Sequence, residues 1–156
     1  MVVLLLAAML LPARAAERTV VLLAGFEALG TARERVELGA RVFRRELALT
    51  PGIVVVTPAE AEVAAGELLL PAAACAGVDP ACAGQLAEAL GADVVVTGQV
   101  AEGPGGTVLT VRLYRVVGGA DTALEQPARS AAPADLETAA AQLAGRLAAH
   151  LTGENR

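Results

Sequence analysis

Three short runs of aliphatic residues constrain the fold of this chain more than any other feature. They read RTVVLLAGF (18–26), IVVVT (53–57) and ADVVVTGQV (92–100). Continuous runs of this length are typical of strands buried on both faces of a sheet. Apolar residues between the first two runs recur at helical spacing, so a helix separates them. Strands that alternate with helices favour crossover connections and parallel neighbours.

The second half of the chain follows another pattern. The segment TVLTVRLYRVV (107–117) alternates between apolar and polar residues, and the glycine-rich turn 103–106 joins it to the third run. A second turn leads to a weaker edge strand at Thr122–Gln126, and a final helix covers Ala134–Leu151. The element order βαβααβββα predicts an α/β fold, with a mixed sheet of about five strands and helices packed on it.

Two proline-containing motifs predict where helices begin. Thr57 can cap a helix whose first turn holds Pro58 and Glu60, which is the spacing of a capping box. The pair Asp79-Pro80 repeats this cap-then-proline start and opens a helix over 79–90, and Gly91 ends it in the left-handed conformation that glycine favours.

The first fifteen residues, MVVLLLAAMLLPARA, form an apolar run that ends in a small-x-small site at Ala13–Ala15. The run is too short to cross a bilayer core of ~30 Å as a helix. It matches a secretory signal peptide over 1–15, cleaved near Ala15, and Pro12 and Arg14 argue against the alternative of a buried strand or helix. We therefore expect a single domain over 16–156, exported to the periplasm, with no transmembrane span in the mature form.

Composition and charge argue against nucleic acid as a partner. The net charge is −5 and aromatic residues make up 2% of the chain, whereas phosphate binding needs clustered cations and base stacking needs aromatic rings. The nearest basic cluster is Arg41, Arg44 and Arg45. It alternates with Glu37 and Glu46 on a helix, which is typical of a solvated face.

A catalytic site needs a nucleophile, a base and a group that orients them, and the sequence offers no such set. The single histidine, His150, is placed to stabilise a helix end. Ser130 lies in a connector rich in alanine and proline, and Asp93 opens a strand as a turn or cap residue. We therefore predict that the chain is not an enzyme, with no cofactor and no metal site.

The segment AGFEALG (24–30) leads from the first strand into a helix, as ligand-binding loops do. Its spacing matches neither a phosphate loop nor a dinucleotide fingerprint, and Glu27 would repel phosphate. In open α/β sheets, ligands bind in the crevice at the strand ends. One hypothesis is therefore a small-molecule or anion-binding sensor domain that uses the crevice at the ends of the first two strands. Its candidate ligand loop consists of Gly25, Phe26, Glu27 and Gly30.

The only two cysteines are Cys75 and Cys82, in CAGVDPAC. Their spacing fits neither a zinc pair nor a Cys-x-x-Cys motif. In an exported protein, two cysteines without a third indicate a disulfide, which would fix an irregular loop to the start of a helix. The closed loop is short, so the expected stabilisation is ~2–3 kcal/mol. A reactive thiol in the first helical turn is the alternative.

The cysteine loop is followed by a helix ending in Leu-Gly-Ala-Asp, a strand running into Thr-Gly-Gln-Val, a glycine hairpin and LTVRLYRVVGG. Together with TVVLLAGFEALG near the start, this pattern resembles the amino-terminal domain of TolB and the CsgG-type curli secretion family, both of the bacterial envelope. The resemblance extends from Arg18 to about Leu151. It implies an α/β domain without catalysis that serves assembly or protein recognition in the periplasm or at the outer membrane. It supplies no catalytic residue.

The leading hypothesis is an exported, non-enzymatic periplasmic module of the bacterial envelope that acts in protein interaction or assembly. Its partner would be another envelope protein or a second copy of the chain, with peripheral association at the outer membrane. The edge strand is the candidate contact surface, since an edge can accept a partner strand. Its residues are Thr122, Ala123, Leu124, Glu125 and Gln126. The connector Gly25–Thr31 is a second candidate surface.

Overall fold

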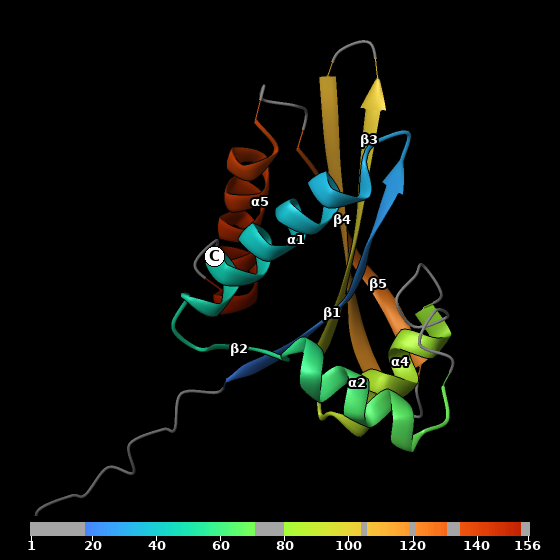
Figure 1. Cartoon of the computed structure of the whole chain (residues 1–156). Coiled ribbons are helices and arrows are strands. Elements are labelled where there is room, and N and C mark those ends of the chain that lie inside the picture. The colour runs from blue at the N-terminus through green and yellow to red at the C-terminus, as the bar shows by residue number, and fades with distance from the viewer. Residues whose placement is uncertain (1–17, 71–79, 104–105, 119–120, 131–134, 154–156) are drawn as a thin grey trace, which may run out of the picture.

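The computed structural model describes residues 18–70, 80–103, 106–118, 121–130 and 135–153 (Figure 1). The predicted signal peptide (1–15) and Cys75 lie outside these ranges. The elements are β1 (Thr19–Leu29), α1 (Arg33–Ala48), β2 (Ile53–Val55), α2 (Pro58–Glu67), α4 (Pro80–Ala89), β3 (Val94–Gly103), β4 (Gly106–Gly118), β5 (Asp121–Ser130) and α5 (Leu136–Thr152).

The strands form one mixed sheet in the order β2-β1-β3-β4-β5. β1 is parallel to both β2 and β3, whereas β3 pairs with β4 and β4 with β5 in antiparallel fashion. The predicted α/β class, the element order βαβααβββα and the mixed sheet with helices packed on it are thereby confirmed. The parallel half comes from crossover helices and the antiparallel half from successive hairpins.

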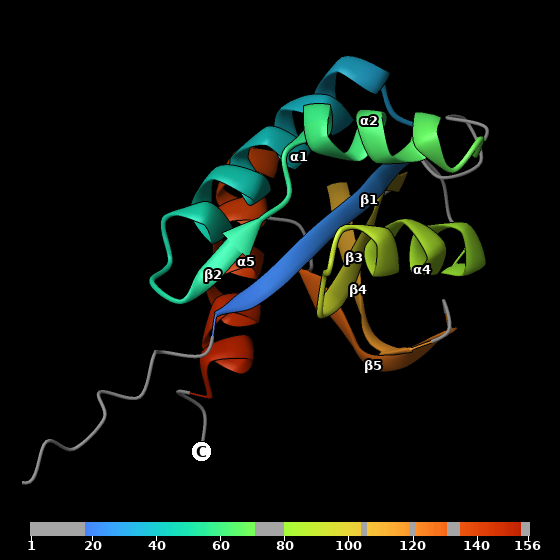
Figure 2. The ribbon, with the colours of Figure 1, turned by 90° about the horizontal axis from the view of Figure 1, so that it is seen from below.

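Helices cover both faces of the sheet (Figures 1 and 2). α1 and α5 lie on one face and share a core with β1, β3 and β4 that includes Phe43, Leu143 and Val96. α2 and α4 lie on the other face, over a smaller core built around Leu22 and Leu86. The molecule is therefore a three-layer arrangement whose sheet is buried from both sides over part of its area.

The alternation predicted for β4 is confirmed. Leu109, Val111 and Leu113 are buried, while Arg112 between them is exposed. The buried residues face α5, because they belong to the same core cluster as Leu143. β4 therefore has one face buried in the core below α5 and one face that is more exposed to solvent.

Several strand ends differ from the predicted ones. β5 extends from Asp121 to Ser130, so Ser130 lies in a strand and not in a connector as predicted. β1 continues through the predicted polar turn to Leu29, because β3 runs beside it as far as the pair Leu29↔Ala101. β2 stops at Val55, short of the predicted end, because Thr57 already caps α2. Strand length is decided here by the neighbouring element and not by local composition.

Asp93 joins three strands at one end of the sheet. Its carboxylate accepts a hydrogen bond of 2.7 Å from the backbone N–H of Val20, and its own N–H donates to the carbonyl of Val20 at 2.9 Å. The N–H of Val116 on β4 donates to the carbonyl of Asp93 at 3.0 Å. Asp93 is therefore a structural residue at the start of β3.

Candidate functional site

The candidate ligand loop does not form as predicted. Gly25, Phe26 and Glu27 belong to β1, so the expected connector from Gly25 to Thr31 is wrong over most of its length. The reason is the pairing of these residues with β3. Only Gly30 lies in the turn after the strand, with a positive φ of 70° that suits glycine.

The side chains of these residues point to different places. The ring of Phe26 packs edge-on against Phe43 of α1, with 5.5 Å between ring centroids. Glu27 is exposed and its carboxylate accepts a hydrogen bond of 3.2 Å from the side-chain amide of Gln99. Of the four predicted residues, Gly25 alone lines the cavity that the structure shows nearby.

The cavity begins where β2 ends. β2 pairs with β1 only as far as Val21↔Val55, so among the described residues no strand lies beside the edge of β1 beyond Val21 on that side. The carbonyl of Val21 points toward β2 and accepts from the N–H of Val56 at 2.9 Å. By the alternation of a strand, the backbone N–H and C=O of Leu23 point to the same open side.

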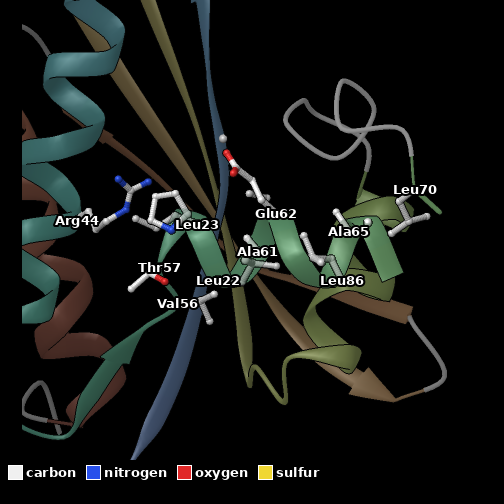
Figure 3. Close-up of a pocket in the computed structure, with 14 residues that line it drawn as sticks. Leu22, Leu23, Arg44, Val56, Thr57, Ala61, Glu62, Ala65, Leu70 and Leu86 are labelled. Atoms are coloured by element: carbon white, nitrogen blue, oxygen red, sulfur yellow. The ribbon is translucent and has the colours of Figure 1, made fainter. Parts of the chain in front are cut away.

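A cavity of about 400 Å³ lies against this open edge, between β1, α1, α2 and α4 (Figure 3). Its walls are mainly apolar and include Leu22, Val56, Ala61, Ala65, Leu70 and Leu86. The polar side chains that line it are those of Arg44, Thr57 and Glu62. The volume is in the range of small-molecule sites. A cavity therefore lies beside the first two strands, where a crevice was predicted, but of the predicted loop residues Gly25 alone lines it.

Arg44 is the residue of this site that sequence reasoning missed. Arg41 and Arg45 are exposed, as expected of a solvated face, but Arg44 is half-buried. Burial lowers the pKa of Arg44 from its ordinary value, although a guanidinium keeps its charge in proteins. Its Nε atom is buried and no atom of the described residues accepts a hydrogen bond from it. The available signal was that Arg44 directly follows Phe43, at the border of the apolar stripe of α1.

The start of α2 also borders the cavity, and its capping residues, Thr57 and Glu60, already bond to each other. Thr57 Oγ1 accepts a hydrogen bond from the N–H of Glu60 at 3.3 Å, and a carboxylate oxygen of Glu60 accepts from the N–H of Thr57 at 2.8 Å. The predicted capping box is thus confirmed. The hydrogen bond from the backbone of Thr57, and next that from its side chain, hold the pKa of Glu60 below its usual value. Arg44 is therefore the group in the cavity best able to attract an anion.

The predicted contact surface lies on β5, an outermost strand of the sheet. Within the described residues no strand pairs with its outer edge. The register with β4 shifts inside the predicted segment, from Leu113↔Gln126 to Tyr114↔Leu124, so Glu125 forms a bulge. Bulges weaken an edge as a template for further strands. The bulge divides the candidate surface into two parts.

The orientation of the β5 backbone follows from its neighbour. The N–H of Val116 donates to Asp93 at the start of β3, so the even-numbered residues of β4 direct their backbone groups to β3 and the odd-numbered ones to β5. Ala123, paired with Arg115, therefore bonds inward to β4. Thr122 is paired with an even-numbered residue and directs its N–H and C=O to the free edge.

The other predicted residues, Cys82 and His150, lie on helices α4 and α5. Cys82 is buried in α4 within the core of that face, and its pairing with Cys75 stays a prediction because Cys75 lies outside the described residues. His150 lies in the last turn of α5, as expected. The described ranges hold no cluster of three or more potential metal ligands. None of the helices in these ranges combines the length and the apolar character needed to span a bilayer.

Comparison with known proteins gives matches in fold but not in sequence. No protein-family model matches the chain, and no curated protein matches it. The LpoB C-terminal domain from Salmonella enterica is 18% identical, with a TM-score of 0.59 over 72% of this chain and 80% of that one. The corresponding domain from Escherichia coli is 15% identical, with a TM-score of 0.61 over 71% and 79%.

TolB from Acinetobacter baumannii is also similar in fold. It is 17% identical, with a TM-score of 0.57, and the match covers 87% of this chain but 29% of TolB. At such identities the likeness concerns the fold alone, since one fold carries many functions. The predicted resemblance to TolB is thus confirmed at the level of fold, and the resemblance to the CsgG-type family stays a prediction.

Proposed function

We propose that this chain is an exported, non-enzymatic module that binds another protein of the bacterial envelope, or a second copy of itself, through the outer edge of β5. The fold that it shares with a part of TolB supports an envelope setting. The resemblance to the CsgG-type family adds an assembly role to this proposal. The mature protein would start after the signal peptide 1–15 and work in the periplasm.

The observation that carries the proposal is the outer edge of β5, with which no strand of the described ranges pairs. An unpaired strand edge presents backbone N–H and C=O groups in a row, and an extended segment of a partner can bond to them. Because of the bulge at Glu125, the available row is the part before it, with Thr122 directed outward. We therefore expect the contact to centre on Thr122–Leu124 and to be short.

A photo-crosslinking experiment tests this contact in intact cells. A photoreactive amino acid is placed at position 122 and, as a control, at position 41 on the exposed face of α1. We expect position 122 to capture one defined envelope protein or a second copy of the chain, and position 41 to capture neither. Capture from position 41 alone would contradict the proposal.

A matched pair of substitutions tests the backbone contact itself, with a photoreactive residue at position 124. Thr122→Pro removes the outward N–H, whereas Thr122→Ala keeps it and removes only the hydroxyl and methyl groups of the side chain. We expect Thr122→Pro to abolish capture and Thr122→Ala to retain it. Equal capture by both variants would exclude strand addition. Ala123→Pro serves as a comparison that breaks the bond to β4 and should lower the melting temperature more.

A further inference from the structure

We propose that the cavity between β1, α1, α2 and α4 binds a single-chain amphiphile with an anionic head group, whose head lies at Arg44 and whose tail runs toward Leu70 and Leu86. This inference concerns another surface than the edge of β5 and does not depend on the protein contact. It rests on the arrangement of the residues that line the cavity, on the apolar character of its walls and on the half-buried guanidinium of Arg44.

The residues that line the cavity follow the length of α2, and Arg44 lies apart from the apolar residues Leu70 and Leu86. Figure 3 shows Arg44 on one side and Leu70 and Leu86 on the other, with Ala61 between them and Ala65 beside Leu86. The small alanine side chains leave room for a chain to lie along α2. An extended apolar tail with one polar end fits this distribution, whereas a compact polar metabolite would leave the apolar walls uncovered.

Arg44 sets the charge of the head group. Its guanidinium is partly desolvated, and the described residues offer neither an ion pair to this side chain nor an acceptor to its buried Nε. Because the buried Nε leaves no surface for a ligand to reach, a carboxylate or phosphate head group would bond the other nitrogens of this half-buried guanidinium, unpaired among the described residues, in charge-assisted hydrogen bonds. The N–H of Leu23, which points to the same open side of β1, offers a second donor for the head group.

Glu62 limits where the head can lie. Its side chain lines the cavity, rises from α2 between the two ends in Figure 3 and is exposed. A carboxylate there repels an anion, so the head group must stay on the Arg44 side of it. This repulsion makes Glu62 useful in the test, because its removal should act in the opposite direction to the removal of Arg44.

The test is displacement of the neutral fluorescent probe N-phenyl-1-naphthylamine from the purified mature chain, with every competitor below the concentration at which it forms micelles. The competitors are dodecanoate, dodecyl phosphate, dodecanol and dodecyltrimethylammonium, which share one chain length. We expect the two anions to displace the probe at lower concentration than the neutral and cationic compounds. Comparing dodecanoate with dodecyl phosphate distinguishes a fatty-acid head group from a phospholipid-type one.

Variants on either side of the head group make the test specific. Arg44→Gln should weaken dodecanoate binding about tenfold, as expected for a lost hydrogen bond between charged groups. Arg41→Gln makes the same charge change on the exposed face of α1 and should leave binding unchanged. Glu62→Gln should strengthen anion binding. Ala61→Leu fills the half-buried middle of the cavity and should abolish binding of all four compounds and of the probe.

Melting temperatures show that each variant is folded. The proposal is overturned if the probe does not bind, if charged and neutral competitors displace it equally, or if Arg44→Gln and Arg41→Gln behave alike. If Arg44→Gln is itself unfolded, the opposite shifts expected from Glu62→Gln and Ala61→Leu decide the matter. Unchanged binding in both of those variants would then exclude the cavity as the site.

Discussion

The ring of Phe26 on β1 lies directly over Gly98 on β3, in the space that a β-carbon at that position would occupy. The two residues are register partners on neighbouring parallel strands. The ring can lie there only because Gly98 has no side chain, and it then reaches Phe43 on α1. The contact links the extended half of β1 to the helix above it.

Substitution of Gly98 tests this contact. Gly98→Ala should destabilise the protein by about 1–3 kcal/mol, because the new methyl group overlaps the ring of Phe26 and forces it off its position. The measurement is urea denaturation followed by circular dichroism. Gly145→Ala is the control: Gly145 is an exposed glycine in α5 with no atom near the added β-carbon, and this change should stabilise by about 0.5–1 kcal/mol. Equal effects of the two changes would contradict the packing described.

The capping box of α2 predicts a dependence on pH. The pKa of Glu60 is lowered in the folded state, so its contribution is fully present above the unfolded pKa and is lost as the pH falls through the folded one. The melting temperature should therefore fall as the pH is lowered below the ordinary value of 4.5, and Glu60→Gln should reduce that fall.

Thr57→Ala provides the control for this prediction. Loss of the cap should cost about 1 kcal/mol at neutral pH. In the Thr57→Ala background, Glu60→Gln should have a smaller effect on the acid dependence that does not vanish, because the hydroxyl is gone but the backbone N–H at position 57 still donates to Glu60. An undiminished effect would show that Glu60 acts through another contact.

Asp135, the N-cap of α5, predicts a second acid-sensitive contact. Its carboxylate accepts hydrogen bonds from the hydroxyl of Thr138 at 2.6 Å and from the N–H of Glu137 at 3.0 Å, and these bonds lower its pKa. The same sign applies as for Glu60, so stability is lost as the pH falls through the lowered pKa. Asp135→Ala should lower the melting temperature at neutral pH and have a smaller effect in strong acid. If Asp135→Ala lowered the melting temperature equally at neutral pH and in strong acid, this role of Asp135 would be contradicted.

Asp93 should contribute through its bond to Val20. Asp93→Ala removes the carboxylate that accepts from the N–H of Val20, and a cost of about 1 kcal/mol is expected in chemical denaturation. Asp93→Asn keeps an oxygen at the same place and should cost less. If both variants are as stable as the unchanged protein, the bond between β1 and the start of β3 contributes nothing measurable.

We propose that Cys75 and Cys82 form a disulfide in the exported protein. Intact mass should then rise by two hydrogens on reduction, and Cys82→Ser should reduce stability by ~2–3 kcal/mol, the value expected for a short closed loop. Alkylation without reductant provides the control, because a reactive thiol would be modified and a disulfide would not. Modification of both cysteines in the purified periplasmic protein would contradict the proposal.

Several features of this protein were determined by the sequence alone. The capping box at Thr57–Glu60 depends on residues within one helical turn, and so does the end of α4 before Gly91, whose positive φ of 62° is confirmed. The buried and exposed sides of β4 follow from the period of two in its sequence. Such signals are local, and each is read from a few neighbouring residues.

The tertiary structure decided the rest. Glu27 to Leu29 are strand because β3 continues beside them. The length of β3 cannot be predicted from the residues of β1. Arg44 has the same sequence pattern as Arg41 and Arg45, but in the folded chain it is half-buried and lines the cavity that α2 also borders. The cavity exists because β2 stops while β1 goes on. Its walls come from four elements, so only the folded chain brings them together, since contacts between distant segments leave no local periodicity to read.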